Sequence, residues 1–433
     1  MSSHADAQTL QDIIQYARKH SPYYRDLYKD VNSVAPSLEE LPVTDSERYW
    51  ELAHADAATV LTSPFTDGSP IRSGGSTTVP KMVFITRREI ALSGQIMGAA
   101  WVRAGLLAPG DVIANLYSFG GMYGGFQYVN KAIENAPAPV AHLPLSSACP
   151  LDIVEHEIEA FAATVIIAPV FHITRLADHI SKSGRPARSV RMILFSGESL
   201  STSIVATWRE VFPHAAIHPS MYSSVDSGGL AVVPRACADA DDKWAVDMAV
   251  APIYAVVPGG SVVELLADDG TAITEPDTPG HVFITSLVRR LQPAIRYPVG
   301  DLAVWVDYGA RALRFLGRGS VAIKIVSSWF DISVLKALLA EVLATEVVGR
   351  LQCVLRREGL VSVLIFRLAV AAPADEDEVR EKVEARLREL SPSWTKSRDA
   401  GRIAPLRFEW VDVSELVFQE NSGKLKEIVD ERV

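Results

Sequence analysis

Residues 73–81 read Ser73-Gly74-Gly75-Ser76-Thr77-Thr78-Val79-Pro80-Lys81, with four hydroxyl side chains and two glycines in the first six positions. Glycine lets backbone amides approach a ligand closely, and the hydroxyls add hydrogen-bond donors beside them. Such a loop can wrap a polyphosphate, with the charge of Lys81 at its edge. An ordinary solvent loop has a similar composition. The rest of the chain has to decide between these interpretations.

The length and composition predict a globular protein with more than one domain. A chain of 433 residues favours one large domain and a smaller one, and a hydrophobic content of 48% supplies their cores. The polar start of the chain has no apolar signal region, and no apolar run is long enough to span a membrane. Three scattered cysteines fit a reducing cytosol better than a disulfide framework. We therefore expect a cytoplasmic protein.

The net charge of -10 argues against nucleic acid as a partner, because no basic stripe accompanies it. An anionic ligand would have to be met by a few well-placed cations. The candidates are Lys81, Arg296, Arg318 and Lys424.

The first half of the chain alternates helical and apolar segments. Helical spacing predicts a helix over residues 8–20, and capping-box spacing between Thr86 and Glu89 predicts another that runs to about residue 105. Residues 30–66 are predicted to be irregular. Apolar runs at 112–117, 164–168 and 192–195 each follow a helical stretch. This alternation predicts an α/β fold with a mainly parallel sheet, whose ligands lie in the loops 118–125, 169–172 and 196–201.

The second half predicts short strands and then a separate small domain. Strands are expected at 262–266, 281–287 and 303–306, followed by a flexible point at 317–320. Beyond it we expect a helix at 332–343, a hairpin at 351–356 and 361–368, a helix at 376–390 and a strand at 406–413. The predicted domains are residues 1–316 and residues 317–433, the second being α+β and plausibly ferredoxin-like.

Four further motifs could each belong to a nucleotide site. Ser196-Gly197-Glu198-Ser199 could present backbone groups to a purine, or be an ordinary strand-to-helix turn. Tyr222 could stack on a base while Asp226 holds magnesium, or be a buried tyrosine beside a surface acid. Residues 295–301 contain a Pro/Gly turn whose Asp301 could clamp a ribose, or cap the turn. Lys424 follows a glycine on a loop, where it could also simply be solvated.

The order of these motifs resembles that of the acyl-adenylate-forming superfamily, and within it the phenylacetate–CoA ligase-like enzymes. The likeness covers most of the chain. It includes SPYYR at 21–25, LPVT at 41–44, YSFGGMYGG at 117–125, LQPAIRYPVGDLAVW at 291–305 and NSGKLKEI at 421–428.

The resemblance implies a large adenylating domain and a small domain on a hinge, with ATP, Mg²⁺ and coenzyme A as cofactors. It assigns the phosphate loop to Ser73–Lys81, the adenine site to Ser196–Ser199, Tyr222 and Ser223, and the ribose to Asp301. Asp226 stands where the family has a magnesium-binding glutamate, and Arg318 matches the hinge arginine. Lys424 matches the lysine that contacts the substrate carboxylate and the α-phosphate. A homodimer is a family-level expectation only.

Three positions depart from the family pattern. Val79 replaces a glycine in the phosphate loop, Val321 stands where an acid often follows the hinge arginine, and Ser327 stands where a glycine commonly lines the pantetheine tunnel. The last two concern the second half-reaction, in which the acyl group could instead pass to a carrier protein or an amine.

The expected substrate is a small aromatic carboxylic acid of the anthranilate, benzoate or phenylacetate type. Tyr117, Phe119, Tyr123 and Phe171 would form a compact aromatic wall, although each could equally be a core residue. The complete expected set is Tyr117, Phe119, Gly120, Gly121, Tyr123, Gly124, Pro169, Phe171 and Met221. The leading interpretation is an aryl-CoA ligase. One alternative is an adenylating enzyme that transfers the aryl group to an acyl carrier protein or an amine in secondary metabolism. The other is a non-catalytic relative that binds the nucleotide or the acid.

Overall fold

The computed structural model consists of two compact units, formed by the residues up to 318 and by those from 322 onward. It describes residues 4–73, 81–197, 200, 202–226, 228–232, 252–318, 322–326, 328–359, 361–418 and 425–432. The expected α/β architecture of a large unit followed by a small C-terminal α+β unit is confirmed. No helix among these residues combines the length and the apolar character that crossing a bilayer requires.

A five-stranded parallel sheet is the first core element of the large unit. Its strand order is β4-β3-β5-β6-β7. The strands are β3 (Val112–Asn115), β4 (Ala141–Leu143), β5 (Val165–Pro169), β6 (Met192–Ser196) and β7 (Ala216–Pro219). Its helices are α4 (Arg87–Arg103), α5 (Gly125–Glu134), α6 (Leu151–Ala160), α7 (Val170–Ser183) and α8 (Thr202–Val211). The helix predicted from Thr86 begins with the expected capping box.

Side-chain alternation along these strands explains why helices cover both faces. In β5, Val165 and Ile167 pack with α4 and α5, whereas Ile166 and Ala168 pack with α6, α7 and α8. Successive strand residues point to opposite faces of a sheet. A strand buried on both faces is therefore apolar throughout, which is why these runs could be recognised in the sequence.

An antiparallel sheet of order β11-β12-β13-β14-β10-β9-β8 forms the second part of the large unit. Its strands are β8 (Tyr222–Ser224), β9 (Gly228–Val232), β10 (Ile253–Val256), β11 (Ser261–Leu266), β12 (Gly280–Ser286), β13 (Tyr297–Asp307) and β14 (Ala312–Arg318). The turn expected within 295–301 is wrong from Tyr297 onward, because this segment belongs to β13. An irregular register with β12 at His281/Phe283 accompanies Pro298 in the ladder.

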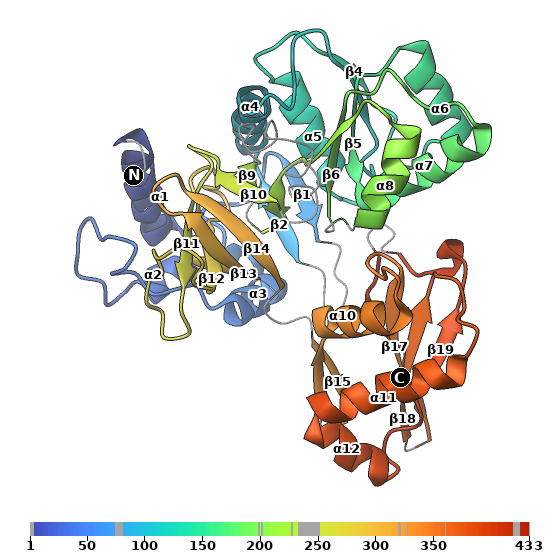
Figure 1. Cartoon of the computed structure of the whole chain (residues 1–433). Coiled ribbons are helices and arrows are strands. Elements are labelled where there is room, and N and C mark those ends of the chain that lie inside the picture. Colours follow the sequence, from blue (N-terminus) through green and yellow to red (C-terminus); the bar gives the residue numbers. More distant parts are fainter. Residues whose placement is uncertain are drawn as a thin grey trace. The chain divides into compact units, whose positions relative to one another are not determined.

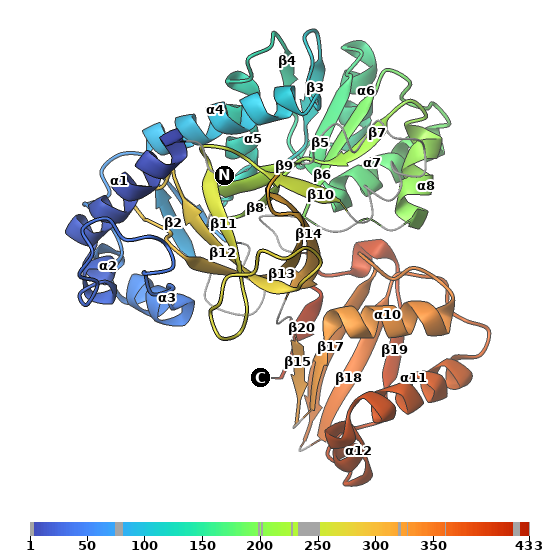
Figure 2. The ribbon, with the colours of Figure 1, turned by 60° about the vertical axis from the view of Figure 1, so that its left-hand side comes forward.

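The N-terminal helices cover this second sheet. They are α1 (His4–His20), α2 (Pro22–Leu27) and α3 (Ser46–Ala55), followed by the short helix η1 (Ala57–Thr59). Figures 1 and 2 both show α1, α2 and α3 beside β11, β12 and β13, and their aromatic residues share one core with those strands. The prediction that 30–66 is irregular is therefore wrong at α3. Asp45 caps this helix by accepting a hydrogen bond from the Arg48 amide.

A hairpin of β1 (Ser69–Arg72) and β2 (Met82–Ile85) flanks the hydroxyl-rich loop of the opening motif. The small unit contains β15 (Ala322–Ile325), β16 (Ser328–Asp331), β17 (Leu351–Glu358), β18 (Val361–Leu368), β19 (Arg407–Trp410) and β20 (Ile428–Asp430). Its helices are α10 (Ile332–Leu343), α11 (Glu376–Leu390), α12 (Pro392–Asp399) and η3 (Val413–Glu415). Its main sheet has the order β19-β18-β17-β20. The predicted hairpin and both predicted helices of this unit are confirmed.

Candidate active site

The hydroxyl-rich loop is closed at its base by its first and last residues. The Ser73 amide donates to the Lys81 carbonyl at 2.9 Å, and the Lys81 amide donates to Ser73 Oγ at 2.9 Å. These bonds continue the antiparallel ladder between β1 and β2 by one step. Gly74, Gly75, Ser76, Thr77 and Thr78 lie outside the described residues. The structure thus places the two ends of the predicted phosphate loop together.

Lys81 and Asp226 form an ion pair, although 144 residues separate them in the chain. The Lys81 Nζ to Asp226 Oδ2 distance is 2.7 Å. The Asp226 side chain is 11% exposed and the Lys81 side chain 35% exposed, so the pair lies at the surface of the core rather than within it. Two residues that the sequence assigned to phosphate and metal binding are therefore direct neighbours.

Two aromatic residues that the sequence analysis did not assign complete this cluster. Tyr297 Oη donates to Asp226 Oδ2 at 2.7 Å and lies 3.0 Å from Lys81 Nζ. Trp50 Nε1 donates to Tyr297 Oη at 2.6 Å, and the Lys81 ammonium lies 5.3 Å from the centre of a Trp50 ring. Trp50 comes from α3. The helix-capping signal at Asp45 could have located that helix, but no local signal points Trp50 toward Lys81.

Arg289 binds the backbone of Asp226. It is buried, and its Nη1 donates to the Asp226 carbonyl at 2.9 Å. Arg289, Trp50, Asp226, Gln292 and Tyr297 contribute to the lining of a small hollow in the large unit. The sequence analysis did not single out Arg289, since a basic pair between two strands is usually solvated.

Arg296, in contrast, is not a cation of this site. It forms a buried ion pair with Glu264 at 3.0 Å and donates to the Leu41 carbonyl at 2.6 Å. The expectation that Arg296 meets an anionic ligand is therefore wrong. Its charge is already matched within the protein.

The residues predicted to contact the base and the ribose also meet. Tyr222 Oη donates to Asp301 Oδ2, and the Tyr222 ring stacks on Phe315 with a centroid distance of 3.7 Å. Tyr222 and Ser223 lie in β8, and Asp301 lies in β13 opposite Arg318 of β14. This ladder therefore brings Asp301 and the backbone of Arg318 together.

At the carboxyl edge of the parallel sheet, two serine hydroxyls lie beside one buried tyrosine. Tyr117 Oη lies 2.5 Å from Ser196 Oγ and 3.4 Å from Ser220 Oγ. Burial raises the pKa of the Tyr117 phenol, so this group keeps its proton at neutral pH. Gly197 follows with a φ of 95°, a conformation that glycine adopts without strain. Glu198 and Ser199 lie outside the described residues.

The predicted substrate residues divide between the core and the surface. Tyr117 is buried and Tyr123 packs against the same core cluster, whereas Phe119 is 73% exposed and contacts Phe126 at a ring distance of 5.3 Å. Phe119 is thus not part of an enclosed wall in this structure. Gly120 and Gly121 both have positive φ and turn the chain beside it. Pro169 is the last residue of β5 and Phe171 lies in the first turn of α7. Gly124 immediately precedes α5, and Met221 immediately precedes β8.

A buried polar cluster lies at the same sheet edge. Ser147 Oγ donates to Ser118 Oγ at 2.9 Å, and Ser118 Oγ lies 3.5 Å from His172 Nε2. Burial, with a smaller effect of Arg175, lowers the pKa of His172 to about 4. His172 is therefore neutral at physiological pH, and sequence reasoning did not assign it a role.

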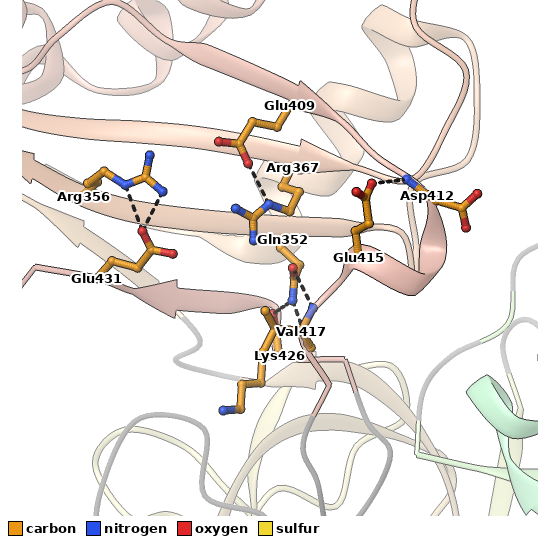
Figure 3. A network of polar contacts seen from close by, with 9 residues as sticks. All are labelled: Gln352, Arg356, Arg367, Glu409, Asp412, Glu415, Val417, Lys426 and Glu431. Carbon is orange, nitrogen blue, oxygen red and sulfur yellow. Dashed lines mark hydrogen bonds and ion pairs between the residues drawn. The ribbon is translucent and has the colours of Figure 1, made fainter.

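In the small unit, one buried glutamine ties together the two ends of the segment that carries Lys424. Gln352 Nε2 donates to the carbonyls of Val417 and Lys426, both at 2.8 Å, and Gln352 Oε1 accepts from the Val417 amide at 3.1 Å (Figure 3). The Lys426 amide also donates to the Val417 carbonyl, and Phe418 pairs with Leu425. Lys424 lies outside the described residues, but the positions flanking its segment are fixed.

Solved structures provide the comparison for this arrangement. A 2-hydroxyisobutyryl-CoA ligase in the postadenylation state superposes with a TM-score of 0.70 at 17% identity, over 99% of this chain and 89% of that one. The O-succinylbenzoate coenzyme A synthetase MenE of Bacillus subtilis, in complex with AMP, gives 0.53 at 15% identity, over 84% and 69%. McyG A-PCP complexed with phenylalanyl-adenylate gives 0.52 at 14% identity, over 93% and 68%. The chain shares the fold of these enzymes.

Neither a protein-family model nor a curated protein matches the sequence at a significant level. The shared fold is thus recognised from the three-dimensional structures, whose sequences are 14 to 17% identical to this chain. Within this fold, the described residues that the sequence motifs single out are Ser73 and Lys81 at the two ends of the loop, the Tyr222–Asp301 pair and residues 425–428.

The donor set around Asp226 fits a magnesium ion that arrives with a nucleotide. The described residues contain no group of three or more His, Cys, Asp and Glu side chains that could hold a metal by themselves. Mg²⁺ usually takes one or two carboxylates together with phosphates and water. In the described part of the chain Asp226 Oδ2 is engaged by Lys81 and Tyr297, which leaves Oδ1 as the oxygen suited to a metal.

Proposed function

We propose that the protein is an AMP-forming ligase that activates a small aromatic carboxylic acid with ATP and transfers the acyl group to coenzyme A. The observation that carries this proposal is the meeting of three sequence motifs at two contacts. Lys81 is paired with Asp226 at 2.7 Å, and Tyr222 is bonded to Asp301. The motifs come from distant parts of the chain, and their order in the sequence resembles that of the acyl-adenylate-forming enzymes.

In the first half-reaction an oxygen of the substrate carboxylate attacks the α-phosphorus of ATP. The bond from that phosphorus to the bridging oxygen breaks, and pyrophosphate leaves with the electron pair. Lys81 meets the phosphates at the loop, Asp301 binds the ribose hydroxyls, and Lys424 contacts the carboxylate and the α-phosphate. Cations help most where negative charge develops in the transition state. Mg²⁺ held by Asp226 and the nucleotide would neutralise phosphate charge.

In the second half-reaction the thiol sulfur of coenzyme A attacks the acyl carbonyl and loses its proton. The carbonyl–oxygen bond to phosphate breaks, and AMP leaves. We propose that residues 317–433 form a mobile domain that carries Lys424 and turns about Arg318 between the two steps. The boundary between residues 316 and 317 is part of this proposal.

The acceptor and the acid are the least constrained parts of the proposal. Aromatic residues at the sheet edge favour a flat aryl acid, and the resemblance favours anthranilate, benzoate or phenylacetate types. Val321 and Ser327, which depart from the family pattern at positions linked to thioester formation, lie outside the described residues. Transfer to a carrier protein or an amine is the second candidate, favoured by these departures and by the likeness to an adenylation domain joined to a carrier protein. A non-catalytic relative that binds the nucleotide or the acid is the third.

The deciding experiment is ATP–pyrophosphate exchange with a panel of aryl and aliphatic acids, followed by AMP release with and without coenzyme A. Exchange with an aryl acid and turnover that depends on coenzyme A support the proposal. Exchange without such turnover favours the carrier-protein or amine acceptor. No exchange with any acid, together with binding of ATP alone, favours the non-catalytic relative.

Lys424→Ala tests the proposed catalytic lysine. We expect it to slow exchange by about a hundredfold or more, because removing one group that stabilises the transition state costs about 2–4 kcal/mol. The matched control is Lys426→Ala, which removes the side chain two positions away and keeps the backbone carbonyl that Gln352 binds. Near-normal exchange in Lys424→Ala would contradict the assigned role.

A further inference from the structure

We infer that Trp50, Asp226 and Tyr297 form a clamp that positions the Lys81 ammonium for nucleotide binding, with Trp50 and Tyr297 acting as positioning residues. The inference rests on the proposed function, in which Lys81 meets the phosphates of ATP. It extends the nucleotide site to helix α3, which supplies Trp50. The N-terminal helices would then serve the reaction as well as the fold.

Lys81 is held by three different groups. Its ammonium pairs with Asp226 Oδ2 at 2.7 Å, lies 3.0 Å from Tyr297 Oη and faces a Trp50 ring at 5.3 Å. A lysine side chain loses substantial rotamer entropy when it is ordered, and a free one would sample many positions around the loop. A cation on an indole face is also stabilised by the ring quadrupole. These contacts therefore order the ammonium before any ligand arrives.

Tyr297 is the centre of the clamp. Its hydroxyl accepts from Trp50 Nε1 at 2.6 Å and from Lys81 Nζ at 3.0 Å, and it donates to Asp226 Oδ2 at 2.7 Å. A phenol has one proton to donate and two lone pairs, so all of its capacity is used. Replacement by phenylalanine would remove all three contacts at once.

The clamp should affect nucleotide binding more than folding. Removing Trp50 or Tyr297 leaves the Lys81 side chain present, but its ammonium is no longer held in one position. We expect Trp50→Phe and Tyr297→Phe each to weaken ATP binding about tenfold. Trp50→Phe removes the indole proton that binds Tyr297 and weakens the cation–π contact with Lys81, and Tyr297→Phe removes the phenol that binds Lys81 and Asp226. A residue that only stabilised the fold would lower the melting temperature and leave the affinity for ATP unchanged.

The experiment is isothermal titration of the full chain with ATP and magnesium, without the acid. Matched controls remove similar groups from the same core whose hydrogen bonds go to residues outside the clamp. Trp305→Phe removes an indole that donates to the Ile273 carbonyl at 2.8 Å, and Tyr24→Phe removes a buried phenol bonded to Thr44 and the Pro293 carbonyl. The clamp variants should lose affinity about tenfold, and the controls less than twofold. Melting temperatures of all four variants identify any loss of fold.

A double-mutant cycle tests whether the loss of ATP affinity depends on Lys81. In a Lys81→Ala background, Tyr297→Phe should cause no further loss of affinity, because the group that it positions is gone. The same loss in both backgrounds would overturn the inference, and so would clamp variants that bind ATP like the controls. If Tyr297→Phe does not fold, Trp50→Phe in both backgrounds carries the test. A wild-type chain that binds no ATP would instead overturn the proposed function on which the clamp depends.

Discussion

Arg296 and Glu264 show how a single buried pair can decide the role of a charged residue. Both side chains are almost fully buried, and the guanidinium also binds the Leu41 carbonyl. Burial raises the pKa of Glu264, and the charge of Arg296 acts in the opposite direction. Arg296 thereby joins the strand β11 to the N-terminal segment. Its neighbour in sequence, Tyr297, belongs to the candidate site.

Glu264→Gln should destabilise the large unit by about 3 kcal/mol, because it leaves the Arg296 charge buried without its counter-charge. Urea unfolding measures the change. The control is Glu358→Gln, which breaks the exposed ion pair between Glu358 and Arg407 and should have a much smaller effect. Equal effects of the two variants would show that the buried pair is no more important than the surface pair.

His172 should make stability dependent on pH. Its pKa is about 4 in the folded protein and near 6.5 when it is exposed. Above pH 6.5 the residue is neutral in both the folded and the unfolded state, so its titration does not change the free energy of unfolding. As the pH falls from 6.5 to 4 the unfolded chain binds a proton that the folded chain does not, and the free energy of unfolding decreases by about 2–3 kcal/mol.

His172→Gln isolates this contribution, since glutamine does not titrate. Unfolding of both proteins in urea at pH 7.5 and at pH 4.5 should show a smaller loss of stability in the variant. Other groups titrate in the same range, but they do so equally in both proteins. Identical pH dependence of the two would mean that His172 is not buried in its neutral form.

At the scale of elements, the segment that carries Lys424 is held by strand β17. Gln352 of β17 is fully buried and makes three hydrogen bonds to the backbone at Val417 and Lys426. Gln352→Leu keeps a similar volume but removes the partner of the Val417 amide and of the Lys426 carbonyl, whereas the Val417 carbonyl still accepts from the Lys426 amide. Each such group costs about 1–3 kcal/mol, so we expect about 2–4 kcal/mol of destabilisation.

Hydrogen exchange provides the local measurement for this variant. The Val417 and Lys426 amides should exchange faster in Gln352→Leu, whereas the ladder between β17 and β18 should remain protected. Arg356→Gln is the control on the same strand, because it breaks only the pair with Glu431 near the surface (Figure 3). Unchanged protection of Val417 in Gln352→Leu would mean that the glutamine does not hold this segment.

At the scale of the whole molecule, the small unit has a core of its own. The buried cluster formed by Leu335, Cys353, Phe366, Trp394 and their neighbours contains only residues from 323 onward. A separate core is what allows a domain to fold alone. A fragment of residues 320–433 should therefore unfold cooperatively in urea and show dispersed amide resonances. A fragment without a cooperative transition would mean that this unit depends on the rest of the chain.

Much of the fold could be predicted from the sequence, because its strongest signals are local. The capping box at Thr86, the apolar runs of β3, β5 and β6, and the periodicity of α11 depend only on neighbouring residues. The helix α3 was missed since prolines on both sides suggested a loop. The segment 297–301 was taken for a turn because Pro298 and Gly300 are turn residues in most contexts, whereas here the pairing with β12 and β14 decides.

The sequence by itself determined the α/β architecture, the small C-terminal unit and the order of the candidate nucleotide motifs, because each is written in consecutive residues. Tertiary structure alone decided that Lys81 meets Asp226 and Tyr297, that Trp50 belongs to this cluster, and that Arg296 does not. The hydrogen bonds among Trp50, Lys81, Asp226 and Tyr297 join residues from 71 to 247 positions apart. A side chain's partner across such a distance depends on how sheets and helices pack, and no local pattern of residues records that packing.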